Sequence, residues 1–313
     1  MRGPERASHA GAGSVTRYDL SLAFALNPHE EQTLTDSSPP KLGVCSWSLQ
    51  PNSPEELAEK VGEIGVSAVQ LHLDPLRTGD WNTQVTVEAL ASVGAEVVSG
   101  MMGMEAEDYS SLESICETGG VRPDEHWEEN LRAAHGNAAV ARELGVDLVS
   151  LHAGFLPHDP ADPERPKLIS RLHELDEAFK GEGIRLAFET GQEDAETLLA
   201  VLEELGSDNI GVNFDPANMI LYAMGDPVES FERLAEHVMQ VHIKDATKTE
   251  TPGTWGAEVP VGTGEVDWDG FFGVMSAKGL EVGMMIEREA GDDRVEDIRI
   301  ARSLVDEKMG AQA

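Results

Sequence analysis

The sequence reads RLAFE at residues 185–189, GVNFD at 211–215, MQVH at 239–242 and GMMIE at 283–287. Each segment is a short apolar run of the kind that forms a buried strand, and each ends in a side chain that can bind a metal ion. These side chains are Glu189, Asp215, His242 and Glu287. In a parallel barrel the carboxyl ends of the strands meet at one mouth, where catalytic groups collect. Three carboxylates and an imidazole there predict a site for one hard or borderline divalent cation.

From Lys41 onward, short strand-like runs alternate with amphipathic helical stretches, which is typical of βα units and a parallel sheet. Strands are predicted at 42–48, 68–73, 96–102, 148–152, 184–189, 210–214, 238–243 and 282–287. A capping box with proline at 53–56 predicts the first helix, and Asp226-Pro227 predicts another. Eight such units over about 270 residues predict an α/β fold, a single-domain (β/α)8 TIM barrel at 41–313. The alternative is an open doubly wound sheet, but no glycine-rich nucleotide loop follows the first strand.

Residues 1–40 lack this periodicity and are predicted to be an N-terminal extension outside the core, partly disordered. No apolar run reaches the ~18–20 residues needed to cross a bilayer, and we see no secretory signal. The cysteines, Cys45 and Cys116, have neither a metal-ligand nor a CxxC spacing. We therefore expect two reduced thiols in a cytoplasmic protein without a membrane partner.

The charge of the chain is strongly negative, with 58 Asp and Glu against 23 Lys and Arg and a formal net charge of −35. Such a charge repels phosphate backbones, which argues against nucleic acid as a partner. The acidic residues are spread over the whole chain. A surface of this kind suits a halophilic protein, because concentrated salt screens its self-repulsion (Debye length ~3 Å at 1 M). An ordinary acidic protein is the alternative.

Polar residues stand on alternate positions near the predicted strand ends. Side chains alternate along a strand, so Asn213 and Gln240 should face the interior together with the proposed ligands. Buried polar groups need partners, and a metal with a polyhydroxylated ligand would supply them. Taken singly, Asp215 could instead cap a helix that begins at Pro216, and His242 could be a hydrogen-bonded core histidine.

The chain from about Leu42 to Met309 resembles the xylose-isomerase-like barrel superfamily of sugar isomerases and epimerases. The resemblance rests on FET at 188–190, VNFDPAN at 212–218, VHIKD at 241–245 and IERE at 286–289. It implies that the four side chains named above bind one Mn²⁺, Mg²⁺ or Co²⁺ ion, with Glu189 and Glu287 as the acid–base pair. The ketose 3-epimerase branch commonly carries a histidine three residues after the metal aspartate, where this chain has Asn218.

The expected reaction starts from a small sugar whose carbonyl and neighbouring hydroxyl oxygen lie on the cation. The cation stabilises the enediolate that forms when one carboxylate removes the adjacent proton, and a second group returns that proton. Return to the opposite face is epimerisation, and return to the neighbouring carbon is aldose–ketose isomerisation.

Five further residues are predicted to contact the sugar. Lys244 could polarise a substrate oxygen, His152 could hold a hydroxyl, and Trp47 could form an apolar wall beside the ring. His72 and Asn218 complete the set. Each has a structural alternative, either hydrogen bonding within the fold or, for the tryptophan, core packing.

Three other functions fit parts of this pattern. A lyase or dehydratase on a keto-inositol or a 3-oxo-glycoside would share the fold, the metal and the enolate. A DNA-repair endonuclease of the endonuclease IV type would need additional metal ligands and a cationic groove, which the acidic charge opposes. A non-catalytic barrel would bind a sugar or a metal without turnover.

The sequence leaves open whether the sugar is phosphorylated. VGTGEVDW at 261–268 follows the seventh predicted strand, where barrels often bind phosphate, although a plain turn is the simpler explanation. Arg288 or Arg294 could meet a phosphate or pair with surface acids. The sequence does not select the metal. It does not fix the oligomeric state either, although barrels of this type often form homo-oligomers.

Overall fold

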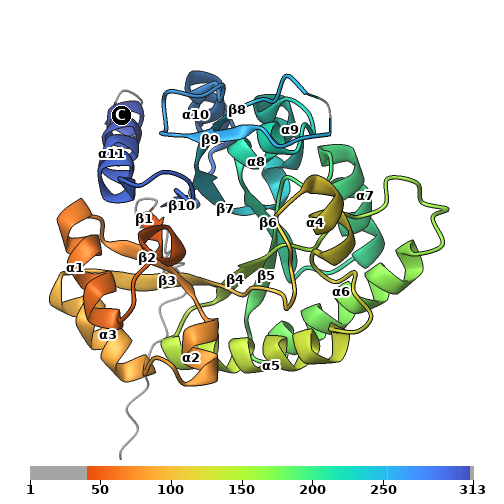
Figure 1. Ribbon diagram of the computed structural model, residues 1–313, viewed down its shortest axis with the longest axis horizontal. Coiled ribbons are helices and arrows are strands. Elements are labelled where there is room, and N and C mark those ends of the chain that lie inside the picture. The colour runs from red at the N-terminus through yellow and green to blue at the C-terminus, as the bar shows by residue number, and fades with distance from the viewer. Residues whose placement is uncertain (1–40, 252, 311–313) are drawn as a thin grey trace, which may run out of the picture. The chain divides into compact units, whose positions relative to one another are not determined.

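The computed structural model describes residues 41–251 and 253–310, so the predicted extension at 1–40 lies outside the described residues. Eight parallel strands close into a barrel in the order β1-β10-β7-β6-β5-β4-β3-β2 (Figure 1). The barrel strands are β1 (Leu42–Cys45), β2 (Ala68–His72), β3 (Glu96–Met101), β4 (Leu148–Leu151), β5 (Arg185–Glu189), β6 (Ile210–Phe214), β7 (Val238–Ile243) and β10 (Gly283–Ile286). Closure of the sheet confirms the predicted (β/α)8 barrel over the open-sheet alternative.

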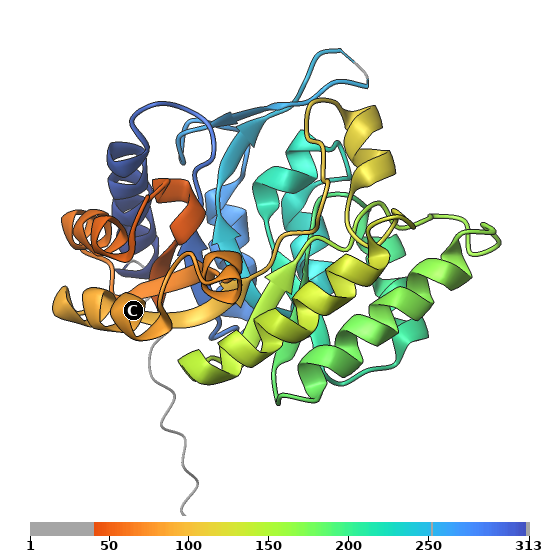
Figure 2. The same cartoon turned by 60° about the horizontal axis from the view of Figure 1, so that its bottom comes forward.

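Helices surround the strands, and the long helices α5 and α6 lie side by side on the outside of the barrel (Figure 2). The helices are α1 (Pro54–Ile64), α2 (Asp74–Thr78), α3 (Thr83–Ser92), α4 (Leu112–Thr118), α5 (Trp127–Leu144), α6 (Arg165–Lys180), α7 (Ala195–Leu205), α8 (Pro216–Leu221), α9 (Pro227–Leu234), α10 (Trp268–Lys278) and α11 (Arg294–Gly310). No helix in the described ranges is both long and apolar enough to span a membrane.

Local sequence signals set the helix ends. Ser53 caps α1 by accepting a hydrogen bond from the Glu56 backbone N–H at 3.2 Å, with Pro54 in the first turn. Helix α1 then ends at Gly65, whose φ of 77° is the left-handed conformation that glycine adopts without steric cost. Asp226 caps α9 in the same way. Both predicted helix starts are confirmed.

The barrel interior is polar across its middle, while the outward faces of the strands form the apolar core with the helices. Phe188, Phe214 and Val241 are fully buried outward neighbours of the site residues. Inside, Ser99 of β3 donates to Gln240 of β7 at 2.6 Å, a bond between strands that are not neighbours in the sheet. Such bonds cross the interior, so the polar groups there are paired with one another.

Several departures from the predicted strands bear on the position of the site. Strand β1 ends at Cys45 rather than at 48, because the chain turns into a 3₁₀ helix, η1 (Ser46–Leu49), which carries Trp47. After β7, the chain forms an unpredicted antiparallel hairpin of β8 (Asp245–Thr247) and β9 (Ala257–Val259). A second 3₁₀ helix, η2 (Ala235–His237), leads into β7. His152 lies one residue beyond β4, not within it.

Candidate metal centre

Four metal-seeking side chains meet at the carboxyl ends of four strands. Glu189 is the last residue of β5, Asp215 follows β6, and Glu287 follows β10. His242 is the penultimate residue of β7. One donor atom from each of the four lies within 4.8 Å of the others, and all four residues are buried. The structure thus brings together the four side chains that the strand pattern singles out, a set that can surround one ion.

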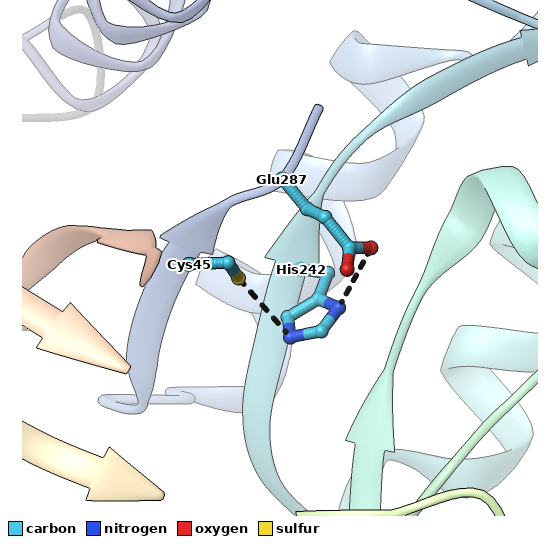
Figure 3. Close-up of side chains that lie close together, drawn as sticks. All are labelled: Cys45, His242 and Glu287. Carbon is cyan, nitrogen blue, oxygen red and sulfur yellow. Dashed lines mark hydrogen bonds and ion pairs between the residues drawn. The ribbon is translucent and has the colours of Figure 1, made fainter. Parts of the chain in front are cut away.

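The imidazole of His242 is turned toward the three carboxylates through Nδ1. This atom lies 3.4 Å from Glu189 Oε1, 3.3 Å from Glu287 Oε2 and 3.8 Å from Asp215 Oδ2. The opposite nitrogen, Nε2, lies 2.8 Å from Gln70 Oε1. Figure 3 shows His242 between Cys45, whose Sγ is 3.7 Å from Nε2, and Glu287. The tautomer with its proton on Nε2 donates to Gln70 and leaves the Nδ1 lone pair facing the carboxylates.

Two atoms of the cluster, Asp215 Oδ2 and His242 Nδ1, lack a hydrogen-bond partner among the described residues. The other oxygen of Asp215, Oδ1, accepts from the backbone N–H groups of Ala217 at 2.8 Å and Asn218 at 3.1 Å. Asp215 therefore caps α8 with one oxygen and presents the other to the centre. Buried polar atoms without partners are unfavourable. A divalent cation coordinated by an imidazole and three carboxylates would satisfy both, so the donor set fits such an ion.

Neighbouring side chains hold the two glutamates in place. Asn218 Nδ2 donates to Glu189 Oε1 at 3.0 Å. Glu287 accepts from the indole Nε1 of Trp47 at 2.6 Å and from Lys244 Nζ at 2.9 Å. Trp47 is therefore more than the apolar wall expected from the sequence, because its N–H orients a proposed ligand.

The charged groups of the cluster shift one another's pKa values. Burial disfavours the ionised form of Glu287, but Lys244 and His242 hold its pKa well below the usual range. Burial raises the pKa of Asp215 despite the nearby Lys244. Burial also opposes protonation of His242, yet the adjacent Cys45, Glu189 and Glu287 raise its pKa well above the usual range. The carboxylates thus stabilise positive charge at the point where the four donors meet.

A cavity of about 430 Å³ adjoins this centre. All five residues predicted to contact a sugar line it: Trp47, His72, His152, Asn218 and Lys244. His152 Nε2 lies 3.8 Å from Glu189 Oε1, whereas His72 Nε2 lies 3.0 Å from Asp74 Oδ2. Burial lowers the pKa of His152, but Glu189 and the other nearby acids more than offset this and raise it overall. The structure thus places these five side chains around one space, where contact with a substrate stays a prediction.

Sequence reasoning missed several other residues of the cavity wall. They include Glu107, Tyr109, Tyr222, Trp255, Glu258 and Glu289. Glu107 and Tyr109 lie between β3 and α4, and Trp255 lies between β8 and β9, in segments without apolar periodicity. Burial raises the pKa of Glu107, whose Oε1 accepts from the Gly120 backbone N–H at 2.9 Å. Among these residues, only Glu289 could have been predicted from the sequence, because it stands two residues after Glu287 in the IERE motif.

Comparison with known proteins agrees with the fold described above. The family model described as xylose isomerase-like TIM barrel matches residues 59–306, more than half of the chain. The chain belongs to the xylose isomerase-like TIM barrel family. A xylose isomerase domain protein from Planctomyces limnophilus superposes with a TM-score of 0.78 at 27% identity, covering 87% of this chain and 98% of that one.

Two more distant structures share the fold of this family. An L-ribulose 3-epimerase superposes with a TM-score of 0.67 at 18% identity, covering 87% of this chain and 95% of that one. A xylose isomerase-like TIM barrel protein from Mycobacterium smegmatis in complex with magnesium superposes with a TM-score of 0.66 at 17% identity, covering 87% and 97%. A curated relative, the uncharacterized protein YihM of Escherichia coli, is 31% identical over 81 residues, which span 26% of this chain and only 24% of that protein.

Proposed function

We propose that this chain is a divalent-metal-dependent isomerase or epimerase of a small sugar. The observation that carries the proposal is the meeting of Glu189, Asp215, His242 and Glu287 beside a cavity lined with polar and aromatic side chains. Family membership supports it, as does the shared fold of a protein named L-ribulose 3-epimerase.

The four donors would hold the cation, and their oxygen-rich set with one imidazole suits Mn²⁺, Mg²⁺ or Co²⁺. Magnesium is present in the complex of the Mycobacterium smegmatis protein. When bound, the cation supplies the Lewis acidity that makes a C–H beside a substrate carbonyl easier to deprotonate.

Glu189 and Glu287 approach the centre from β5 and β10, and their donor atoms lie within 4.8 Å of each other. One carboxylate takes the proton beside the carbonyl, and the other group returns a proton. Asn218, Trp47 and Lys244 keep the two carboxylates oriented through the hydrogen bonds described above. His152 and Lys244 line the cavity and can donate hydrogen bonds to substrate oxygens.

Exchange of substrate hydrogen with solvent deuterium tests this proposal directly. We expect the Mn²⁺-loaded protein to incorporate deuterium beside the carbonyl of a ketose substrate. Glu189→Gln and Glu287→Gln should each lower the exchange rate by about 10²–10⁴-fold, the usual contribution of a general acid or base. Glu203→Gln, on the exposed side of α7, is the matched control. Wild-type exchange rates in both glutamine variants would remove these carboxylates from the reaction.

The mass of the product separates the rival reactions. An unchanged mass supports isomerisation or epimerisation, whereas loss of one water molecule supports a dehydratase acting through the same proton abstraction.

We further propose that the protein works in concentrated salt in the cytoplasm and does not bind nucleic acid. The net charge of −35 supports work in concentrated salt and the absence of nucleic-acid binding. Cys45 and Cys116 are both free thiols, which supports a reducing compartment.

A further inference from the structure

The loops after the seventh and eighth barrel strands are the usual phosphate-binding place of this fold, because their backbone N–H groups converge there. In this chain those loops follow β7 and β10. Both loops have a set of converging N–H donors, and in both the donors are already taken by a carboxylate of the chain itself.

After β7, the glycine-rich segment wraps around Asp245. The Asp245 carboxylate accepts from the N–H groups of Gly262 at 2.9 Å, Gly264 at 3.1 Å and Val266 at 3.2 Å. It also accepts from the indole Nε1 of Trp268 at 3.1 Å. A Cβ on Gly264 would lie 2.1 Å from Asp245 Oδ1, so glycine is required for this close approach. The segment that suggested a phosphate loop therefore binds an internal anion.

After β10, Glu258 of β9 occupies the corresponding position. Its carboxylate accepts from the N–H groups of Glu289 at 2.9 Å and Ala290 at 3.1 Å, and from Arg288 Nη1 at 2.8 Å. Arg288 is also bound by Asp297 at 2.9 Å. Its guanidinium is thus shared between two carboxylates and is not free to receive a substrate anion.

The other arginine near this loop is engaged as well. Arg294 donates from Nη2 to the Glu289 carbonyl oxygen and from Nη1 to the Ser48 carbonyl oxygen at 3.5 Å. Among the lysines and arginines of the described ranges, Lys244 alone lines the cavity. Its ammonium lies 2.9 Å from Glu287 and 2.8 Å from Glu289.

The cavity wall itself is acidic. Three carboxylates, those of Glu107, Glu258 and Glu289, stand on it beside Lys244. A phosphate or carboxylate on the substrate would face these groups, and Lys244 is already paired with Glu287 and Glu289. Such like-charge contacts discriminate against a ligand. Carboxylates and the Tyr109 hydroxyl are, by contrast, good hydrogen-bond partners for uncharged hydroxyl groups.

We propose that the substrate is an uncharged keto sugar without a phosphate or carboxylate group, and that Asp245 and Glu258 fill the two places where this fold would bind a phosphate. This substrate class rests on the isomerase or epimerase function proposed above. The acidic side chains of the cavity wall then disfavour the binding of phosphorylated sugars.

The first experiment compares matched sugars with the Mn²⁺-loaded full chain in deuterated buffer. The probes are D-fructose with D-fructose 6-phosphate, and D-ribulose with D-ribulose 5-phosphate. We expect exchange into the free sugar of a pair to be at least about 100-fold faster than into its phosphate, because like-charge contacts disfavour the phosphate. Equal or faster exchange into the phosphate overturns the inference while supporting the isomerase function. If deuterium enters none of the four sugars, the result counts against the isomerase function. The phosphate-binding experiment described next then tests the inference without turnover.

The second experiment measures binding of ³²P-labelled inorganic phosphate by equilibrium dialysis at one fixed KCl concentration, so it does not depend on turnover. The wild-type Mn²⁺-loaded protein should retain no phosphate, and sub-millimolar binding overturns the inference. Glu258→Ser removes the internal carboxylate and frees Arg288 and two N–H donors. We expect this variant to retain at least about tenfold more phosphate, as a regained charge-assisted site would. Glu203→Gln is the control, and unchanged retention by Glu258→Ser refutes the role given to Glu258.

Discussion

At the residue scale, Gln70 is expected to set the metal affinity although it is not a proposed ligand. Its Oε1 lies 2.8 Å from His242 Nε2, and its Nε2 donates to Ser150 Oγ at 2.7 Å. A partner of this kind fixes the tautomer and the orientation of a metal-binding imidazole. Gln70→Leu should weaken Mn²⁺ binding about 10–100-fold.

Metal titration followed by calorimetry measures this effect. Gln70→Glu keeps an acceptor at the same position and is the conservative variant that should restore much of the affinity. Equal Mn²⁺ affinity in wild type and Gln70→Leu would mean that His242 needs no support from the barrel interior.

Asp215 has two separable roles, one for each oxygen. Its Oδ1 caps α8, and its Oδ2 faces the centre with no hydrogen-bond partner in the part of the chain that the structure describes. Asparagine is also a good helix cap, so Asp215→Asn should lose the metal and keep most of the stability of the metal-free protein. Asp215→Ala should lose the metal and about 0.5–2 kcal/mol of unfolding free energy as well. Metal analysis and denaturant unfolding of the metal-free proteins give both quantities, and equal stability of the two variants would argue against the cap.

The four proposed ligands could be found from the sequence because each ends a short apolar strand, and a strand end has a fixed place in a parallel barrel. The contact between Trp47 and Glu287 could not, since it depends on the chain leaving β1 at Cys45 and turning into η1. The position of Glu107 in the cavity wall could not be predicted from the sequence either. This residue reaches the cavity from an irregular segment, where no periodicity tells which side chain points inward.

At the element scale, Asp74 joins α2 to its surroundings and should make stability depend on pH. It accepts from Arg77 Nε at 2.8 Å, Asn137 Nδ2 at 3.1 Å and the Gly103 N–H at 3.1 Å. Burial opposes its ionisation, but hydrogen bonds from His72 and these groups hold its pKa well below the usual range. A carboxyl whose pKa is lowered by folding stabilises the protein above its unfolded pKa of about 3.9, and that stabilisation is lost as the pH falls toward the folded pKa.

Asp74→Asn should therefore destabilise the protein at pH 7 and reduce the loss of stability between about pH 4 and pH 2. Urea unfolding at several pH values measures both effects. Asp292→Asn, at an exposed position after β10, is the control. An unchanged pH dependence in Asp74→Asn would show that other groups dominate acid unfolding.

Element boundaries were predictable where a cap or a long apolar run marked them and failed elsewhere. Ser53-Pro54 and Asp226-Pro227 begin α1 and α9 as expected, since each side chain satisfies free N–H groups of the first turn. The hairpin of β8 and β9 was missed. Its strands have three residues each, which is too short for an alternation of apolar and polar residues to mark them.

At the scale of the whole molecule, closure of the barrel follows from the number of βα units. Eight strands, each followed by a helical segment, leave no free edge when strand β1 pairs with β10 on one side and β2 on the other. The sequence showed eight units, and closure into one ring pairs every strand on both of its edges.

The net charge of −35 belongs to this scale as well, because it is spread over the chain rather than gathered at one site. Self-repulsion of this kind destabilises the compact state, and added salt weakens the repulsion as the Debye length falls from ~10 Å at 0.1 M to ~3 Å at 1 M.

We expect the melting midpoint to rise from dilute buffer to molar KCl and then to level off, since screening is nearly complete once the Debye length is shorter than the spacing of surface charges. A general salting effect on apolar burial would instead continue to grow with concentration and would be larger in potassium sulfate than in KCl. Calorimetric scans in both salts separate the two causes, and a midpoint that does not change with KCl would contradict adaptation of this surface to high salt.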